Sequence, residues 1–159
     1  GWEYNWIARF MSGAPMDLPG NVDLIGNPKV DNQSFDKWFN GCVKQLDGTA
    51  RQPNVTRTGF EACSNPVWAI RGPNTLRTTP LRSAQIRVTW RPEYDMSINK
   101  SFFITERYRA QFRAEAFNVF NTPIFGSPNN DPNSPNFGFV FRGQRNFPRQ
   151  VQLGFKFIF

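Results

Sequence analysis

Residues 149–159 read RQVQLGFKFIF, and this stretch decides the fold class of the chain. Apolar side chains occupy every second position: Val151, Leu153, Phe155, Phe157 and Phe159. The alternate positions are polar or small, with Ile158 as the one exception: Gln150, Gln152, Gly154 and Lys156. A period of two is typical of a β-strand whose two faces meet different surroundings. The stretch therefore predicts a strand with one apolar and one polar face.

Three other segments repeat this alternation. They cover residues 2–12, 94–104 and 108–120, so the chain is predicted to contain about four such strands. Ten residues at about 3.3 Å each, tilted by about 40°, span about 25 Å, which is the height of the apolar band of an outer-membrane barrel. Residues 84–91 also alternate, and we expect them to extend the strand at 94–104.

The connections between these strands differ greatly in length. Only residues 105–107 separate the second strand from the third, whereas residues 13–92 and 121–148 form long loops rich in Gly, Pro and Asn. Outer-membrane barrels have short periplasmic turns and long outer loops, and both long loops fall on one side if the chain ends in the periplasm. We therefore predict an all-β fold for residues 1–159: an antiparallel up-and-down transmembrane β-barrel segment with long extracellular loops. A soluble β-sandwich, whose strands also alternate, is the alternative.

The composition argues against an enzyme. The chain has 159 residues and no histidine, which removes His-dependent triads, imidazole metal sites and His acid–base catalysis. The 12 Asp and Glu residues are scattered without a diagnostic spacing. We expect no catalytic, cofactor-binding or metal-binding residue, and no cofactor. Because the chain begins inside an apparent strand at Gly1, we also expect it to be part of a longer protein.

Positive charge is concentrated in the first long loop. The formal net charge is +7, and the segment 51–91 holds seven Arg against the single acid Glu61. Such a stretch can bind nucleic acid or another anionic ligand, which makes a soluble, basic, β-rich binding module the alternative function. It can equally be a solvated loop. Nucleic acid is not the partner that we expect.

Charged and amide side chains recur on the polar faces of the predicted strands. A dry core would not tolerate them unpaired, whereas the water-filled lumen of a barrel would. The residues expected to face the lumen are Glu3, Arg9, Arg109, Gln111, Arg113, Glu115, Gln152 and Lys156. They can pair with one another across neighbouring strands, or contact a plug or a passing ligand.

The two cysteines, Cys42 and Cys63, lie 21 positions apart in the first long loop. An exported loop is in an oxidising environment, so a disulfide between them is expected to stabilise the loop by about 3 kcal/mol. Free thiols are the alternative.

Two motifs carry a family resemblance. The first is the terminal aromatic strand with Phe155, Phe157 and Phe159, which resembles the signal read by the barrel-assembly machinery. The second is FRAEAFNVFNTPIFG at 112–126, followed by PRQVQLG at 148–154. Together with residues 2–15, these motifs are similar to the C-terminal end of TonB-dependent receptors of the Oar-like subgroup, which carry a carboxypeptidase-regulatory-like domain.

The resemblance implies a bacterial outer-membrane receptor or transporter with a 22-stranded barrel and an amino-terminal plug, neither plug nor TonB box being among these residues. The implied partners are outer-membrane lipid, the rest of the barrel and its plug, the barrel-assembly machinery, and the TonB complex through an amino-terminal part. The substrate and the direction of transport are not implied.

Overall fold

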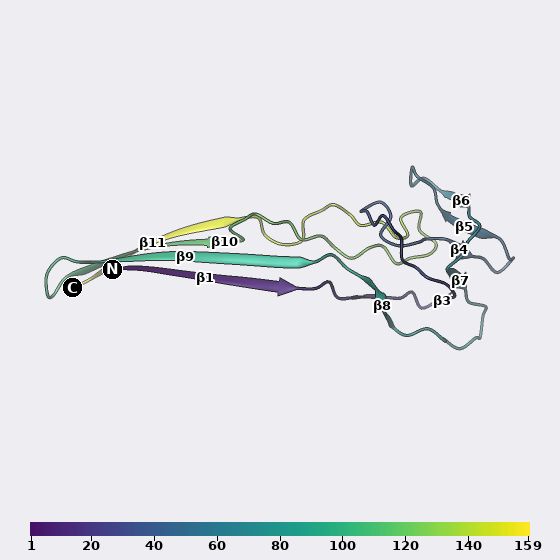
Figure 1. The fold of residues 1–159 in the computed structure, drawn as a ribbon, viewed down its shortest axis with the longest axis horizontal. Coiled ribbons are helices and arrows are strands. Elements are labelled where there is room, and N and C mark those ends of the chain that lie inside the picture. Colours follow the sequence, from purple (N-terminus) through teal and green to yellow (C-terminus); the bar gives the residue numbers. More distant parts are fainter. The chain divides into compact units, whose positions relative to one another are not determined.

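The computed structural model describes residues 1–159 as an all-β chain of eleven strands in two compact units. We call residues 1–12, 90–124 and 144–159 the sheet unit, and residues 13–89 and 125–143 the insert unit. Figure 1 shows the strands of both units. The chain has no helix that is long and apolar enough to cross a membrane.

The sheet unit is one four-stranded antiparallel sheet. Its strands are β1 (Trp2–Met11), β9 (Arg91–Phe103), β10 (Arg109–Phe117) and β11 (Gln150–Ile158), in the spatial order β1-β9-β10-β11. Among these four strands, each pairs with the next one along the chain, which is the up-and-down arrangement. The predicted fold class is therefore confirmed, although four strands leave the barrel open at β1 and β11.

Both long connections leave the same end of this sheet. At the other end, a tight hairpin joins β9 to β10, with the amide of Ile104 donating to the carbonyl of Tyr108 at 3.0 Å. Gly1 and Phe159 lie at this hairpin end, because Gly1 bonds to Ser101 and Arg109 pairs with Ile158 (Figure 1). The sheet thus has one end with a short turn and one end with two long insertions.

Strand β10 ends three residues earlier than the alternation suggested, at Phe117 rather than residue 120. Asn118 and Asn121 adopt left-handed backbone conformations, with φ of 49° and 52°, which asparagine tolerates better than most residues. The Asn118 amide donates to the carboxylate of Asp95 at 3.0 Å, so this turn is tied back to β9. The turn explains why the alternation fades after Phe117.

The insert unit contains seven short strands. They are β2 (Pro15–Asp17), β3 (Val22–Leu24), β4 (Val43–Lys44), β5 (Ala50–Pro53), β6 (Phe60–Ala62), β7 (Trp68–Ile70) and β8 (Arg82–Arg87). One sheet is β2-β8, and the other is β3-β7-β4-β5-β6, in which only β4 and β7 run parallel. The first long loop therefore has secondary structure of its own, whereas no strand lies between β10 and β11.

The expectation that residues 84–91 extend the strand at 94–104 is wrong. Strand β8 ends at Arg87 and pairs with β2, and residues 88–90 separate it from β9. Gly13 lies against this break: a Cβ there would be 1.8 Å from the Val88 carbonyl oxygen. The Val88 amide in turn donates to the Ala14 carbonyl at 3.0 Å.

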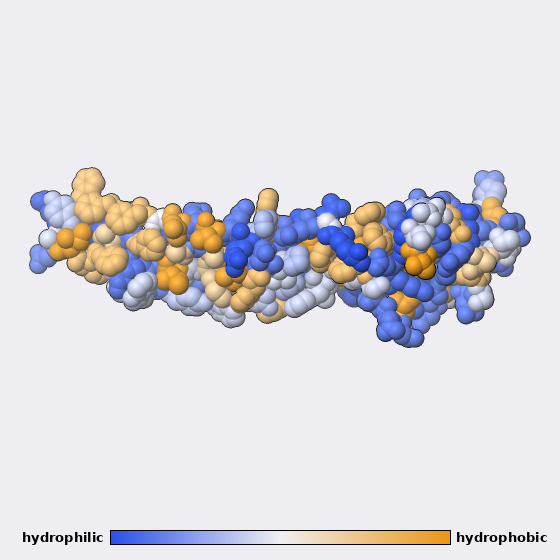
Figure 2. All heavy atoms as spheres, turned by 90° about the horizontal axis from the view of Figure 1, so that it is seen from above, coloured by the Kyte–Doolittle hydropathy of each residue, from blue (hydrophilic) through white to orange (hydrophobic).

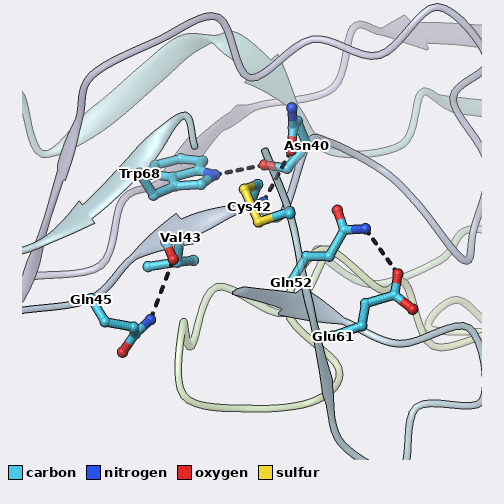
Figure 3. The surroundings of a disulfide bond; sticks show 8 residues. Asn40, Cys42, Val43, Gln45, Gln52, Glu61 and Trp68 are labelled. Atoms are coloured by element: carbon cyan, nitrogen blue, oxygen red, sulfur yellow. Dashed lines mark hydrogen bonds between the residues drawn. A yellow bond between two sulfur atoms is a disulfide. The ribbon is translucent and has the colours of Figure 1, made fainter. Parts of the chain in front are cut away.

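Aromatic side chains form the core of the insert unit. Trp68 is completely buried, and its ring packs edge-to-face against Phe39 and Phe137, with centroids 5.5 and 5.6 Å away. The Trp68 indole donates to the Asn40 carbonyl at 2.7 Å, as Figure 3 shows. Aliphatic side chains complete this core: Met16, Leu18, Val22, Val43, Val67 and Ile86.

A disulfide joins Cys42 and Cys63, whose Cα atoms are 6.0 Å apart (Figure 3). Cys42 comes directly before β4, and Cys63 comes directly after β6. The disulfide therefore links the beginning of β4 to the end of β6, the two ends of the antiparallel run β4-β5-β6.

An ion pair fastens β3 to the chain after β7. The guanidinium of Arg71 donates to both carboxylate oxygens of Asp23, at 2.6 and 3.3 Å. The Arg71 side chain is only 10% exposed, and it also donates to the carbonyls of Gly20 and Val22. The Arg71 guanidinium holds the pKa of the Asp23 carboxyl below its usual range.

We expect Asp23→Asn to lower the free energy of unfolding of the insert unit by about 2 kcal/mol, because a buried guanidinium loses its charged partner. Hydrogen exchange of the β3 and β7 amides measures this loss. Since folding lowers the pKa, the contribution is complete above about pH 4 and disappears as the pH falls through the folded-state pKa. Asp17→Asn breaks the exposed Asp17–Arg82 pair and is the control, with a loss of about 0–1 kcal/mol. Equal losses in the two variants would contradict the assignment.

Candidate membrane-facing surface

The register of the sheet unit gathers the alternating apolar residues of all four strands on one face. Directly opposed residues of antiparallel strands lie on the same face, and Phe112, for example, opposes Lys100 on β9 and Phe155 on β11. We call this the apolar face. Its residues are Trp2, Tyr4, Trp6, Ala8 and Phe10 on β1; Pro92, Tyr94, Met96, Ile98, Lys100 and Phe102 on β9; Ala110, Phe112, Ala114 and Ala116 on β10; and Val151, Leu153, Phe155 and Phe157 on β11.

This apolar face is not covered by another sheet. Trp2, Leu153 and Phe155 remain 71%, 67% and 70% exposed. Figure 2 shows hydrophobic side chains gathered over the part of the chain that forms this sheet. Exposed apolar patches of this extent mark surfaces that contact a membrane or a partner. The β-sandwich alternative is wrong, because it requires a second sheet packed on this face.

Aromatic side chains lie toward both ends of the apolar face. Phe10 and Phe120 both pack edge-to-face on Tyr94, with ring centroids 5.5 and 5.0 Å away. At the hairpin end, Phe157 stacks with Tyr108 and Phe159. From Pro92 to Phe102, the apolar face of β9 spans eleven residues, and the ten steps between them cover about 25 Å of depth at a tilt of about 40°.

Two aromatic residues do not fit an interfacial girdle. Outer-membrane barrels carry girdles of aromatic residues at both interfaces, and the aromatic residues compared with such a girdle are Trp2, Tyr4, Trp6, Tyr108 and Phe159. Trp6 lies in the middle of β1, however, and the hydroxyl of Tyr4 contacts the Met96 sulfur at 3.3 Å on the neighbouring strand. Their positions follow from the period of two, which places every second residue of β1 on the apolar face.

The opposite face of the sheet carries the side chains expected to face a lumen. All eight lie on this polar face: Glu3, Arg9, Arg109, Gln111, Arg113, Glu115, Gln152 and Lys156. Gln111 opposes Lys156, and Glu115 opposes Gln152. The register therefore unites residues from the two ends of the sequence on one polar surface.

Three of these eight residues form ion pairs. Arg9 bonds to Glu93 on the neighbouring strand at 2.8 Å, and Arg113 pairs with Glu115 on its own strand. The other five form no ion pair. The carbonyl oxygen of the Asn99 side chain lies between Glu3 and Arg113 in the register and has no hydrogen-bond partner. The polar face therefore has charged and amide groups without a partner within the chain, such as Lys156 and the side-chain oxygen of Asn99.

The terminal aromatic residues lie on an edge strand. Phe155 and Phe157 project from the apolar face of β11, and Phe159 follows the strand. Strand β11 pairs only with β10, so its other edge is open for pairing. Residues proposed as an assembly signal are thus exposed beside an unpaired strand edge.

The insert unit has a pocket that the sequence did not indicate. It has a volume of about 240 Å³ and lies over Phe39 and Phe137, with Gln52, Arg57 and Glu61 among its polar lining residues. Burial lowers the pKa of the Arg57 guanidinium, which stacks on Phe139 at 5.2 Å. These residues come from distant segments, so no local sequence pattern brings them together.

Comparison with known proteins identifies the family. The family model described as "Outer membrane beta barrel domain" matches residues 1–152. No curated protein and no solved structure matches the chain. The family places the protein in the bacterial outer membrane, and this location contradicts the alternative of a soluble binding module. Because this model matches residues 1–152 of the 159, and the open, two-faced antiparallel sheet agrees with it, the chain belongs to the outer membrane beta barrel domain family.

Proposed function

We propose that the chain is part of the barrel wall and surface of a TonB-dependent receptor of the Oar-like subgroup, which takes up or exports an unidentified substrate. The observation that carries the proposal is the two-faced sheet, whose charged face is continuous across all four strands. A charged, wet interior opposite a lipid-facing surface is what a transport barrel requires. The role proposed for this chain is not enzymatic.

In this proposal the polar face lines the lumen. The charges without an ion-pair partner, such as Lys156 and Glu3, contact the plug domain or a passing substrate, while the Arg9–Glu93 pair stabilises neighbouring strands. The hairpin at 104–108 faces the periplasm, and the insert unit is extracellular, because long loops of such barrels lie outside. Phe155, Phe157 and Phe159 are then the residues that the barrel-assembly machinery reads.

The size of the insert unit supports a receptor rather than a simple pore. It has an aromatic core, a disulfide and a pocket, so it can present a fixed surface to a ligand. Binding residues often lie on loops that a rigid scaffold positions.

The proposal is tested by TonB binding. The full-length protein, purified in detergent, is expected to bind the soluble periplasmic domain of TonB in a saturable manner by isothermal titration calorimetry. A plugless porin in the same detergent is the control and gives no heat of binding. If the full-length protein behaves like the porin, the chain belongs to another class of outer-membrane barrel.

A further inference from the structure

Lys100 is the single charged residue on the apolar face. The register places it beside Trp2 on β1 and beside Phe112 on β10. All other positions of the face hold aromatic, aliphatic, Met or Pro side chains. A charged side chain on the lipid side of a barrel is unfavourable at mid-membrane and nearly neutral close to the interface.

The position of Lys100 along β9 brings its ammonium within reach of the membrane boundary. Lys100 lies three residues before the end of the strand at Phe103, which is about 10 Å along the strand. A lysine can extend its apolar stem over a lipid-facing surface and keep its ammonium in the polar region. Lys100 therefore fits the headgroup level at the hairpin end of the sheet.

Two aromatic rings hold the ammonium at this place. The Lys100 Nζ lies 4.8 Å from the ring centroid of Trp2 and 5.5 Å from that of Phe102. Both distances are within the range of a cation–π interaction. Lys100 forms no ion pair within the chain, so its charge remains free for an anion.

We propose that Lys100, with Trp2 and Phe102, binds the phosphate of a phospholipid headgroup in the leaflet at the hairpin end of the sheet. The ammonium supplies charge and hydrogen-bond donors to the phosphate, and the exposed rings contact the glycerol and upper acyl region. That this leaflet is the periplasmic one rests on the orientation given under the proposed function. The site itself requires only that the apolar face meets lipid.

Native mass spectrometry of the full-length protein in detergent, titrated with phosphatidylglycerol, tests the site. Lys100→Met is expected to weaken binding of the tightest phospholipid about five-fold, the effect of one basic residue near an anionic surface. Lys100→Arg keeps the charge and is expected to bind within about two-fold of the natural protein. Trp2→Leu, which keeps the lysine but removes its best ring, should weaken binding about three-fold.

Lys156→Met is the matched control, because Lys156 lies on the polar face near the same end of the sheet. Its phospholipid binding should equal that of the natural protein. Unchanged binding in both Lys100→Met and Trp2→Leu would overturn the site. Displacement of the lipid by millimolar inorganic phosphate would overturn it too, because the site would then bind free phosphate.

A spin-label experiment distinguishes an error in the Lys100 phospholipid site from an error in the proposal that the apolar face meets lipid. Nitroxides are attached to Leu153→Cys on the apolar face and Gln152→Cys on the polar face, the native cysteines being joined to each other. Collision with oxygen at 153 and with a water-soluble nickel chelate at 152 shows that the apolar face meets lipid. If this pattern is present and Lys100→Met binds phospholipid normally, only the Lys100 site is wrong. If the pattern is absent, the proposed orientation of the wall is wrong as well.

Discussion

A lysine in place of Leu153 is expected to destabilise the assembled barrel by about 2–4 kcal/mol. Leu153 lies one residue from the centre of β11, is 67% exposed on the apolar face, and shares a row of opposed residues with Ala114 and with Ile98 in the middle of β9. In a lipid bilayer the new ammonium would lie far from both headgroup regions, and the neighbouring Ala114 offers it no counter-charge. The loss is measured by reversible guanidinium unfolding of the full-length protein in lipid vesicles.

Gln152→Lys on the same strand is the control for Leu153→Lys. Gln152 lies on the polar face opposite Glu115, so a lysine there gains an acidic neighbour in a wet environment. We expect its free energy of unfolding to change by no more than about 0.5 kcal/mol. Two equal changes would mean that the two faces of β11 do not meet different surroundings.

The Trp68→Ala substitution is expected to reduce the stability of the insert unit by about 3–5 kcal/mol. The Trp68 side chain is fully buried, contacts Phe39 and Phe137, and donates to the Asn40 carbonyl. Its removal leaves a cavity between three chain segments and an acceptor without a partner. Hydrogen exchange of the β4 and β7 amides in the full-length protein reports the change.

Leu76→Ala serves as the control for Trp68→Ala, because Leu76 is 89% exposed in the same unit. Its effect is expected to remain within about 0.5 kcal/mol. The amides of β9 and β10 should stay protected in both variants, since these strands belong to the other unit. Loss of protection in β9 would show that the two units do not unfold separately.

The wall of the barrel was predictable because its signal is local. Strands that separate lipid from water must alternate over about ten residues, and RQVQLGFKFIF shows this pattern within a single stretch. The pairing β9-β10 followed from the short connection between them. Glu3 and Lys156 are distant in the sequence but lie on the same polar face. This could be inferred from the alternation within each strand once the order of the strands was known.

The insert unit was not predictable in the same way. Its strands have two to six residues, which is too short for a period to be recognised. The core forms from segments separated by up to about a hundred residues, such as Phe39 and Phe137. The pocket at Arg57 is lined by Phe39 and Phe137 of this core, so the sequence did not predict the pocket either. Residues 84–91 were wrongly joined to the strand at 94–104, because alternation indicates a strand but does not show where it ends.

The aromatic core of the insert unit combines two separate insertions of the wall. Phe39 and Trp68 come from the chain between β1 and β9, whereas Phe137 comes from the chain between β10 and β11. The first insertion therefore cannot complete its core until residues 125–143 have joined it, so folding of the insert unit must wait for the connection between β10 and β11. Anyone grafting the surface of this protein onto another barrel would have to move both insertions together.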